Sequence, residues 1–294
     1  MSRLLIFEDS AFLRAPVQSR DKVSKLGTQL ADTIGALTDD EVAIIRAMEA
    51  LRELKGQILR ISRPTSIIDV TGGVLSSSLE CFGDIPVFNL GLSRVRKLDD
   101  KLSGQGFLLR GDWNQASTAD LSRPLLLDDV NWSGRSIIEV MSLLGVETEQ
   151  CIVGNLTTNW GMFGNKEGGG KLLQNMGVLV LSGSNVSTPE DDGFHLEDFS
   201  VNNGEKPFQR ILTLDELRDL KQRGVFLDRA GLPKSGTAEF GINPNNLLMP
   251  SFQKRVRIDS EALDELLEIG RQLHDAMNDN NELGTETKAE LKLC

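Results

Sequence analysis

The stretch from Leu125 to Ser136 constrains the fold of this chain more than any other. Three leucines run into Asp128 and Asp129, and Ser133-Gly134-Arg135-Ser136 then opens a segment whose apolar residues recur at helical spacing. Continuous apolar runs are typical of buried parallel strands, and ligands bind at the carboxyl edge of such sheets. The stretch therefore predicts a central strand, a ligand loop and a helix. An ordinary strand-to-helix connection with an Asp/Ser cap is the alternative.

The residues of this loop suit a phosphorylated sugar. The Ser133–Ser136 turn offers hydroxyls, a glycine that tolerates unusual dihedral angles, and backbone N–H groups at a helix N-terminus. Asp128 and Asp129 beside it suit sugar hydroxyls or a ligand that carries magnesium. Trp132, within the same loop, either stacks on a base or packs against the sheet.

A second glycine loop follows an earlier predicted strand. Ser66–Val70 is predicted as a strand, Thr71-Gly72-Gly73 as a tight loop, and Val74–Phe82 as a helix before a strand at Pro86–Leu90. This order predicts a βαβ unit. Paired glycines at the end of its first strand let the backbone approach a pyrophosphate closely, although a tight turn alone also explains them.

A basic cluster follows that unit. Its five cations stand against only two acids, Asp99 and Asp100, and Ser103–Gly106 adds a glycine-rich turn. A mobile basic loop can close over an anionic ligand and exclude water, whereas the alternative is a solvated hairpin. The cations are Arg94, Arg96, Lys97, Lys101 and Arg110.

Composition excludes several functional classes. The 294 residues contain three cysteines, far apart, and two histidines, which supports neither a zinc site, a disulfide framework nor a Ser-His-Asp triad. A net charge of -11 argues against a nucleic-acid backbone as the main partner. The apolar runs are too short to cross a bilayer, and the first fifteen residues are charged where a signal peptide would be apolar. We therefore expect a cytoplasmic protein without a membrane partner.

The N-terminal residues carry no recognisable chemistry. Leu4–Phe7 predicts an edge strand, and residues 17–61 predict two helices, the second opened by a capping box at Thr38–Glu41. These helices would form a cap or an oligomerisation surface, which leaves a homodimer open.

The C-terminal half continues the strand and helix alternation. Strands are predicted at 150–156 and 178–181, with a short helix at 171–176 between them. Gly168–Lys171 does not make a phosphate-binding P-loop, because the glycine spacing is wrong and Leu172 replaces the required hydroxyl. Residues 182–209 are predicted as a surface loop or insertion.

Four segments follow from these patterns. We predict an N-terminal strand and helical segment at 1–61 and a core at 62–182. An insertion and helical extension at 183–277 would contain helices at 213–220 and 260–277, and a disordered tail would occupy 278–294.

The order of these features resembles the type I phosphoribosyltransferases, and the orotate branch is most similar. Arg96-Lys97 followed by Lys101 looks like that branch's Arg-Lys-x-x-x-Lys loop, and residues 166–181 and 212–217 look like its C-terminal pattern. One position departs from the branch. Its base-site Asp-Arg pair is absent, because the corresponding residues here are Thr157-Thr158-Asn159-Trp160.

The resemblance implies an α/β fold, with a type I phosphoribosyltransferase-like parallel sheet flanked by helices. It implies a magnesium-dependent transfer of ribose 5-phosphate from phosphoribosyl pyrophosphate (PRPP) to a nitrogenous base or similar small acceptor, with release of pyrophosphate. A PRPP- or nucleotide-binding regulatory or interaction protein without catalysis is the alternative. A hydrolase that uses water as acceptor is a third possibility.

The resemblance also implies roles for individual residues. Asp128 and Asp129 would hold the ribose hydroxyls and, through the ligand or water, Mg²⁺. Catalytic residues would be Asp128, Asp129 and Lys101. The 5-phosphate would be bound by Asn131, Trp132, Ser133, Gly134, Arg135 and Ser136. The pyrophosphate would be bound by Thr71, Gly72, Gly73, Arg96 and Lys97.

Overall fold

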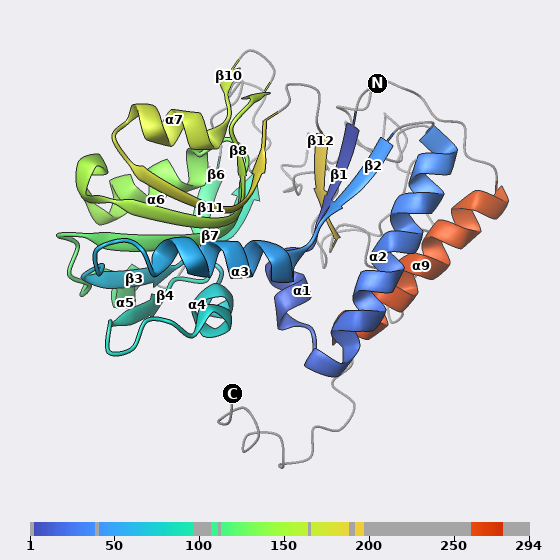
Figure 1. Cartoon of the computed structure of the whole chain (residues 1–294), viewed down its shortest axis with the longest axis horizontal. Helices are drawn as coiled ribbons and strands as arrows, with labels where there is room; N and C mark the ends of the chain where they lie inside the picture. Colours follow the sequence, from blue (N-terminus) through green and yellow to red (C-terminus); the bar gives the residue numbers. More distant parts are fainter. Residues whose placement is uncertain are drawn as a thin grey trace.

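Two parallel sheets organise the chain (Figure 1). The computed structural model describes residues 3–38, 41–96, 107–110, 113–163, 166–187, 192–196 and 260–278. The larger sheet has five strands in the order β11-β8-β7-β3-β4, and the smaller has three in the order β12-β1-β2. The predicted α/β fold with a parallel sheet flanked by helices is therefore confirmed.

The predicted central strand lies in the middle of the larger sheet. All neighbouring strands of this sheet run parallel. The βαβ unit is also confirmed, because helix α4 (Val74–Leu79) connects two adjacent parallel strands, β3 and β4. The five strands are β3 (Ser66–Asp69), β4 (Val87–Asn89), β7 (Pro124–Asn131), β8 (Ile152–Asn159) and β11 (Leu179–Val186).

Helices cover both faces of this sheet, which explains its continuous apolar runs. Leu125 and Leu127 belong to a cluster with helices α3 (Ala47–Ile58) and α4. Leu126 points to the other face and belongs to a second cluster with α6 (Arg135–Leu144) and α7 (Gly169–Asn175). The short helix α5 (Trp113–Ala116) contributes Ala116 to that second cluster. Successive strand residues point to opposite faces, so a strand buried on both faces has no polar alternation.

The smaller sheet corrects two predictions. Its strands are β1 (Arg3–Phe7), β2 (Glu41–Ile45) and β12 (Asp192–His195), and β1 lies in the middle rather than at an edge. The predicted capping box at Thr38–Glu41 is wrong, because β2 follows it and pairs with β1.

The residues of β2 explain why helical periodicity was misleading. Val42 and Ile44 contact the main core, whereas Ala43 and Ile45 contact a small cluster that contains Leu5 and Phe7. With apolar contacts on both faces, this strand reads as a continuous apolar run that periodicity cannot separate from a buried helix.

The predicted loop at 182–209 is also corrected at its start. Residues 182–186 extend β11 along β8, and Asp192–His195 forms β12 beside β1. The polar composition of this region did not indicate these strand residues, because their hydrogen-bonding partners lie elsewhere in the chain, in β8 and β1. Residues 197–209 lie outside the described residues.

Three helices accompany the smaller sheet: α1 (Ser10–Arg14), α2 (Val17–Thr38) and α9 (Ser260–Asn278). The predicted C-terminal helix is confirmed as α9, which packs against α2 (Figure 1). Leu266, Ile269 and Leu273 are buried on its apolar side. The helix predicted at 213–220 and the tail after 278 lie outside the described residues.

The remaining described elements are short. β5 (Ser93–Arg96) and β6 (Phe107–Arg110) form an antiparallel hairpin, as do β9 (Met162–Phe163) and β10 (Lys166–Glu167). A 3-10 turn covers Thr148–Gln150. Among the helices described, none combines the length and the apolar character needed to span a membrane. The four predicted segment boundaries stay predictions. Helix α3 belongs to the predicted segment 1–61, yet it packs against β8 and β11 of the larger sheet.

Candidate functional site

The two acids lie where β7 continues beyond its neighbour β3. Asp69 ends β3 opposite Leu127, and from there to Asn131 β7 pairs only with β8. Asp128 and Asp129 therefore lie inside β7, at the carboxyl edge of the sheet, rather than in the loop after it. Asp128 is 6% exposed and Asp129 is partly exposed. This edge is the expected place for a ligand in an open parallel sheet.

Hydrogen bonds orient both carboxylates. The Asp129 N–H donates to Asp128 Oδ1 at 3.0 Å, and the Val130 N–H donates to Asp129 Oδ1 at 2.8 Å. Ser10 Oγ donates to Asp129 Oδ2 at 2.7 Å, across 119 residues of sequence. The chain itself thus fixes how these acids face the sheet edge.

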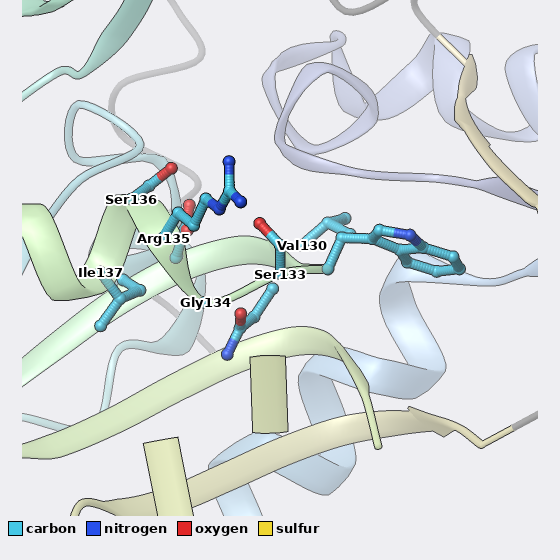
Figure 2. A pocket seen from close by; sticks show the side chains of 9 residues that line it. Val130, Ser133, Gly134, Arg135, Ser136 and Ile137 are labelled. Carbon is cyan, nitrogen blue, oxygen red and sulfur yellow. The ribbon is translucent and has the colours of Figure 1, made fainter. Parts of the chain in front are cut away.

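A small hollow, partly open to solvent, lies at the loop that follows (Figure 2). Gly134 has φ 73°, a left-handed conformation that favours glycine, and it immediately precedes α6. The first N–H groups of a helix have no partner within the helix and attract anions. In Figure 2, Ser133 and Arg135 extend from the same side of the loop. The hollow is lined by Asp128 and residues 130–137.

Helix α7 packs closely against this loop. The Gly169 N–H donates to the Trp132 carbonyl at 2.9 Å. A Cβ atom on Gly169 would overlap Asn131 Oδ1 and come within 2.5 Å of the Gly134 nitrogen. A Cβ on Gly170 would meet the Thr158 and Trp160 side chains within 3 Å. The glycine run thus serves close packing of α7 against the loop, in agreement with the rejection of a P-loop.

Asn131 is the most unusual residue beside the hollow. It is 2% exposed, and both its amide nitrogen and its amide oxygen lack a hydrogen-bond partner in the described part of the chain. Buried polar atoms are normally paired, and those left over mark places where water or a ligand binds. Asn131 was predicted to bind the 5-phosphate; its amide lies against Gly169 of α7, and the predicted role stays a prediction.

The Thr71-Gly72-Gly73 loop lies one strand away. The buried Asp69 carboxylate accepts from the Thr71 N–H at 2.8 Å, from Thr71 Oγ1 at 2.5 Å and from the Ser76 N–H at 2.7 Å. Gly72 and Gly73 have φ 79° and 94°. Asp69 therefore fixes the loop, a role that the sequence analysis missed. The signal was present, because an Asp before Thr-Gly-Gly favours an Asx turn.

Backbone contacts join this loop to the acids and to the basic hairpin. The Val70 N–H donates to the Leu127 carbonyl at 2.9 Å, and the Leu92 N–H donates to the Val70 carbonyl at 2.8 Å. β5 begins at the next residue, Ser93. Two predicted ligand loops thus share one edge, and the hairpin starts beside them. Arg96 ends β5, while its side chain and the residues Lys97 and Lys101 lie outside what the structure describes.

The N-terminal strand reaches the same edge, which the sequence did not predict. The Phe7 ring meets the Trp132 ring edge-on, with centroids 5.8 Å apart and an interplanar angle of 64°. Trp132 therefore packs against β1, the second of the two roles considered for it. Phe7 and Val130 belong to the same small buried cluster, which Trp132 covers.

The end of β8 is polar, buried and without a cation. Thr157, Thr158 and Asn159 are each at most 2% exposed. Asn155 Nδ2 donates to Thr158 Oγ1 at 3.2 Å, while Asn155 Oδ1 and Asn159 Nδ2 have no partner among the described residues. Amides and hydroxyls thus occupy the end of this strand.

The donor set fits a divalent cation held partly by its ligand. Within the described residues, no three His, Cys, Asp or Glu side chains gather as a metal cluster. Among the described residues, Asp128 supplies the carboxylate that lines the hollow, and Asp129 is the next residue of β7. Mg²⁺ keeps several waters and commonly binds one or two carboxylates together with substrate phosphates.

Comparisons with known proteins show similarity to solved structures only. No family model and no curated protein matches the chain. An orotate phosphoribosyltransferase from Aeropyrum pernix is 26% identical, with a TM-score of 0.27, over 47% of this chain and 69% of that one. A purine phosphoribosyltransferase from Pyrococcus horikoshii is 18% identical, with a TM-score of 0.31, over 51% and 87%.

A hypothetical protein from Neisseria gonorrhoeae with bound ppGpp is 17% identical, with a TM-score of 0.36, over 60% of this chain and 90% of that one. All three TM-scores lie below 0.5, so these similarities carry no argument about fold or activity. The functional assignment therefore depends on the residues and geometry of the chain itself.

Proposed function

We propose that this protein is a phosphoribosyltransferase that transfers ribose 5-phosphate from PRPP to a nitrogenous base or similar acceptor. One observation carries the proposal. Asp128 lines the hollow at Ser133–Ser136, Asp129 follows it in β7, and the Thr71–Gly73 loop follows the neighbouring strand β3. The residues proposed to bind the sugar, the 5-phosphate and the pyrophosphate are therefore on neighbouring strands and the loops after them.

The reaction requires stabilisation of two opposite charges. Cleavage at the anomeric carbon builds positive charge on the sugar while pyrophosphate leaves with its negative charge. Asp128 and Asp129 would accept hydrogen bonds from the ribose hydroxyls and favour the cationic sugar. Because hydrogen bonds already orient both carboxylates, little reorganisation is needed during the reaction.

The phosphates would be held by backbone groups and cations. The N–H groups at the start of α6, with Ser133, Arg135 and Ser136, would bind the 5-phosphate. Thr71, Gly72 and Gly73 would bind the pyrophosphate, and Arg96, Lys97 and Lys101 would close over it. Asp128 and Asp129 would hold Mg²⁺ through water and the ligand, and the ion would neutralise charge on the departing pyrophosphate.

The test is consumption of PRPP with Mg²⁺ against a panel of purine, pyrimidine and other nitrogenous acceptors. Asp128→Asn and Asp129→Asn should each lower turnover by about a hundredfold, because preorganised charge contributes this much. Asp32→Asn is the control, since Asp32 is an exposed acid on α2 outside the site. Failure of the wild-type protein to consume PRPP with any acceptor would refute the transferase proposal.

A second candidate is a PRPP-binding protein without transferase activity. One observation favours it, because the residues at the end of β8 that would meet an acceptor, Thr157-Thr158-Asn159-Trp160, contain no cation. Calorimetry that detects PRPP binding without turnover would support this candidate. Release of ribose 5-phosphate without any added acceptor would instead identify a hydrolase that uses water.

A further inference from the structure

The N-terminal segment contributes one hydroxyl directly to the acidic pair. We propose that Ser10 is a positioning residue that holds the Asp129 carboxylate in its reactive orientation, an inference that rests on the proposed phosphoribosyl transfer. Ser10 lies at the start of α1, and its hydroxyl donates to Asp129 Oδ2 at 2.7 Å. No pattern around Ser10 predicts this contact, because 119 residues separate the partners.

The contact matters because it completes the orientation of Asp129. Its Oδ1 atom accepts from the Val130 N–H at 2.8 Å, and its Oδ2 atom accepts from Ser10. A carboxylate oxygen can accept more than one hydrogen bond, so these two donors do not by themselves prevent a sugar hydroxyl from binding. With a donor on each oxygen, rotation of the carboxylate about its terminal bond would break at least one hydrogen bond. The ribose would meet an acid already aligned.

Ser10 is itself firmly held. It is 7% exposed, and the preceding Asp9 caps α1 by accepting from the Ala11 N–H at 2.9 Å. Leu13 donates its N–H to the Asp9 carbonyl, which adds a second tie in the same turn. Burial and the capped turn restrict the orientations of the Ser10 hydroxyl, whereas a surface serine could meet many partners.

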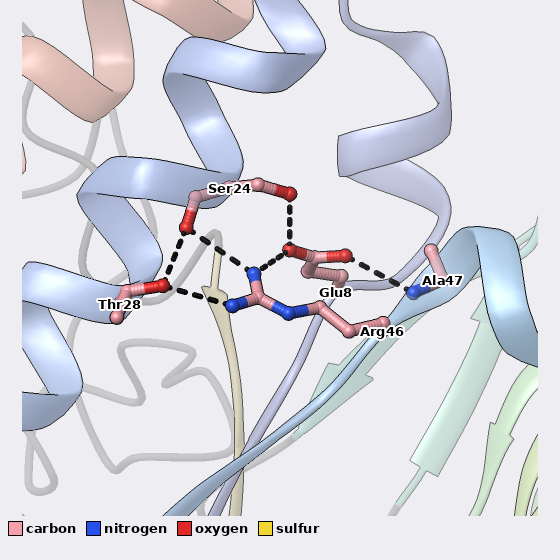
Figure 3. Close-up of polar contacts among 5 residues, drawn as sticks. All are labelled: Glu8, Ser24, Thr28, Arg46 and Ala47. Carbon is pink, nitrogen blue, oxygen red and sulfur yellow. Dashed lines mark hydrogen bonds and ion pairs between the residues drawn. The ribbon is translucent and has the colours of Figure 1, made fainter.

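Glu8, two residues before Ser10, connects the capped start of α1 to two other elements (Figure 3). Glu8 accepts from Arg46 Nη1 at 2.6 Å, from Ser24 Oγ at 2.7 Å and from the Ala47 N–H at 3.1 Å. Arg46 also donates to Thr28 Oγ1 at 2.8 Å. These bonds tie the end of β1 to α2 and to the start of α3, which itself packs on the larger sheet. The position of Ser10 is therefore determined by the fold of both sheets.

Two neighbouring contacts place the turn against the ligand loops. Phe7 packs on Trp132, three residues after Asp129, and α1 packs beside α4, the helix that begins after Gly73. The segment from Phe7 to Ser10 thus lies next to the acids proposed to bind ribose and to α4, the helix that follows the proposed pyrophosphate loop. This location supports a role in the transfer step rather than in folding alone.

The test compares two serine hydroxyls with the same local chemistry. Ser10 Oγ donates to Asp129 and Ser24 Oγ donates to Glu8, each at 2.7 Å and each within the N-terminal segment. PRPP turnover with Mg²⁺ and an accepted base is measured for Ser10→Ala, Ser10→Thr and Ser24→Ala. Circular dichroism and thermal unfolding establish that each variant is folded.

Ser10→Ala should lower kcat by about tenfold, because a hydrogen bond to a charged group is lost, and should change KM for PRPP less than about twofold. Ser10→Thr restores the hydroxyl and should recover most of kcat. Ser24→Ala should retain the wild-type kcat, because Arg46 and the Ala47 N–H still hold Glu8 in place. Adding Ser10→Ala to Asp129→Asn should cause no further loss, because the hydroxyl acts through that carboxylate.

Three results would overturn the inference. Equal effects of Ser10→Ala and Ser24→Ala would assign both hydroxyls to folding alone. Independent effects of Ser10→Ala and Asp129→Asn would show that Ser10 does not act through Asp129. If the wild-type protein does not turn over PRPP, the proposed function and this role of Ser10 are both refuted. That outcome is distinguishable from the first two, because in those the wild-type protein is active.

Discussion

Two glycines determine how closely the elements of the candidate site approach one another. Gly134 must adopt a left-handed conformation before α6, and Gly169 must lie against it without a side chain. Asn131, between them in space, keeps both amide atoms unpaired in the described part of the chain. The conformation of the loop before α6 thus depends on the absence of side chains at Gly134 and Gly169.

Gly169→Ala tests this close packing. The new methyl group would overlap Asn131 and Gly134, so α7 or the loop must shift, which should cost about 1 to 3 kcal/mol of unfolding free energy. Gly56→Ala is the control, because no atom lies within 4 Å of a Cβ built there in α3. It should stabilise the protein by about 0.5 to 1 kcal/mol. Urea unfolding measures both, and equal effects would contradict the packing role of Gly169.

The thiol of Cys151 predicts a specific pH dependence. Burial raises its pKa from 9.0 to about 12, and the residue is 1% exposed. The folded state therefore holds this proton more tightly than the unfolded chain does. The corresponding stability is fully present below pH 9 and is lost as the pH rises toward about 12.

The comparison with Cys151→Ala isolates this contribution. The difference in urea midpoint between wild type and variant should stay constant up to about pH 9 and change above it, with wild type losing stability relative to the variant. Cys81 is present in both proteins, so its titration cancels. Native Cys151 should also resist alkylation at pH 8, whereas rapid alkylation would contradict its burial.

At the scale of elements, an ion pair joins the residues that follow β1 and β2, where the chain enters α3. Glu8 follows β1 and Arg46 follows β2, and their side chains are 1% and 30% exposed. Ser24, Thr28 and the Ala47 N–H complete the network. Breaking a buried pair leaves an uncompensated charge, which is more costly than never having built the pair.

Arg46→Met should therefore destabilise the protein by about 3 kcal/mol, because it leaves the Glu8 carboxylate buried without its cation. Arg271→Met is the matched control, since Arg271 pairs with the exposed Glu268 on α9 and such pairs contribute at most about 1 kcal/mol. Chemical denaturation of the two variants measures the difference. An equally small effect of both would show that the Glu8 network is not a structural connection.

On the scale of the whole molecule, the ends of the described chain pack together. α9 lies along α2, and Thr33 donates to Glu265 at 3.3 Å across 232 residues. Buried residues of α9 belong to the same core cluster as α3, α4 and the larger sheet. The C-terminal helix is thus part of the main core, even though the chain reaches it through residues 197–259, which lie outside the described part.

Leu273→Ala tests this continuity. Leu273 is fully buried in the cluster, and its truncation should cost about 2 to 5 kcal/mol through lost burial and a cavity. Leu143→Ala is the control, because Leu143 is 58% exposed on α6 and should change stability by less than about 0.5 kcal/mol. A single unfolding transition that shifts only for Leu273→Ala is the expected result. A separate early transition would show that α9 does not share the main core.

The sequence by itself determined the larger sheet and the loops at its edge. Apolar runs of the length typical of strands, each ending in polar or glycine residues, predicted the strands of this sheet. These runs are Ser66–Val70, Leu125–Leu127, 150–156 and 178–181. The acids and the two glycine loops were found for the same reason, since they follow those strands directly. Local sequence pattern was sufficient to predict an element wherever residues close in the sequence determine its structure.

Only the tertiary structure decided the smaller sheet and what it brings to the site. β2 and β12 become strands because β1 supplies their hydrogen bonds, and no local pattern in 41–45 or 192–195 contains that information. The contacts of Ser10 with Asp129 and of Phe7 with Trp132 likewise join residues more than a hundred positions apart. Partners at such separations are set by packing of the whole chain, so the acids could be found from the sequence and the serine that orients one of them could not.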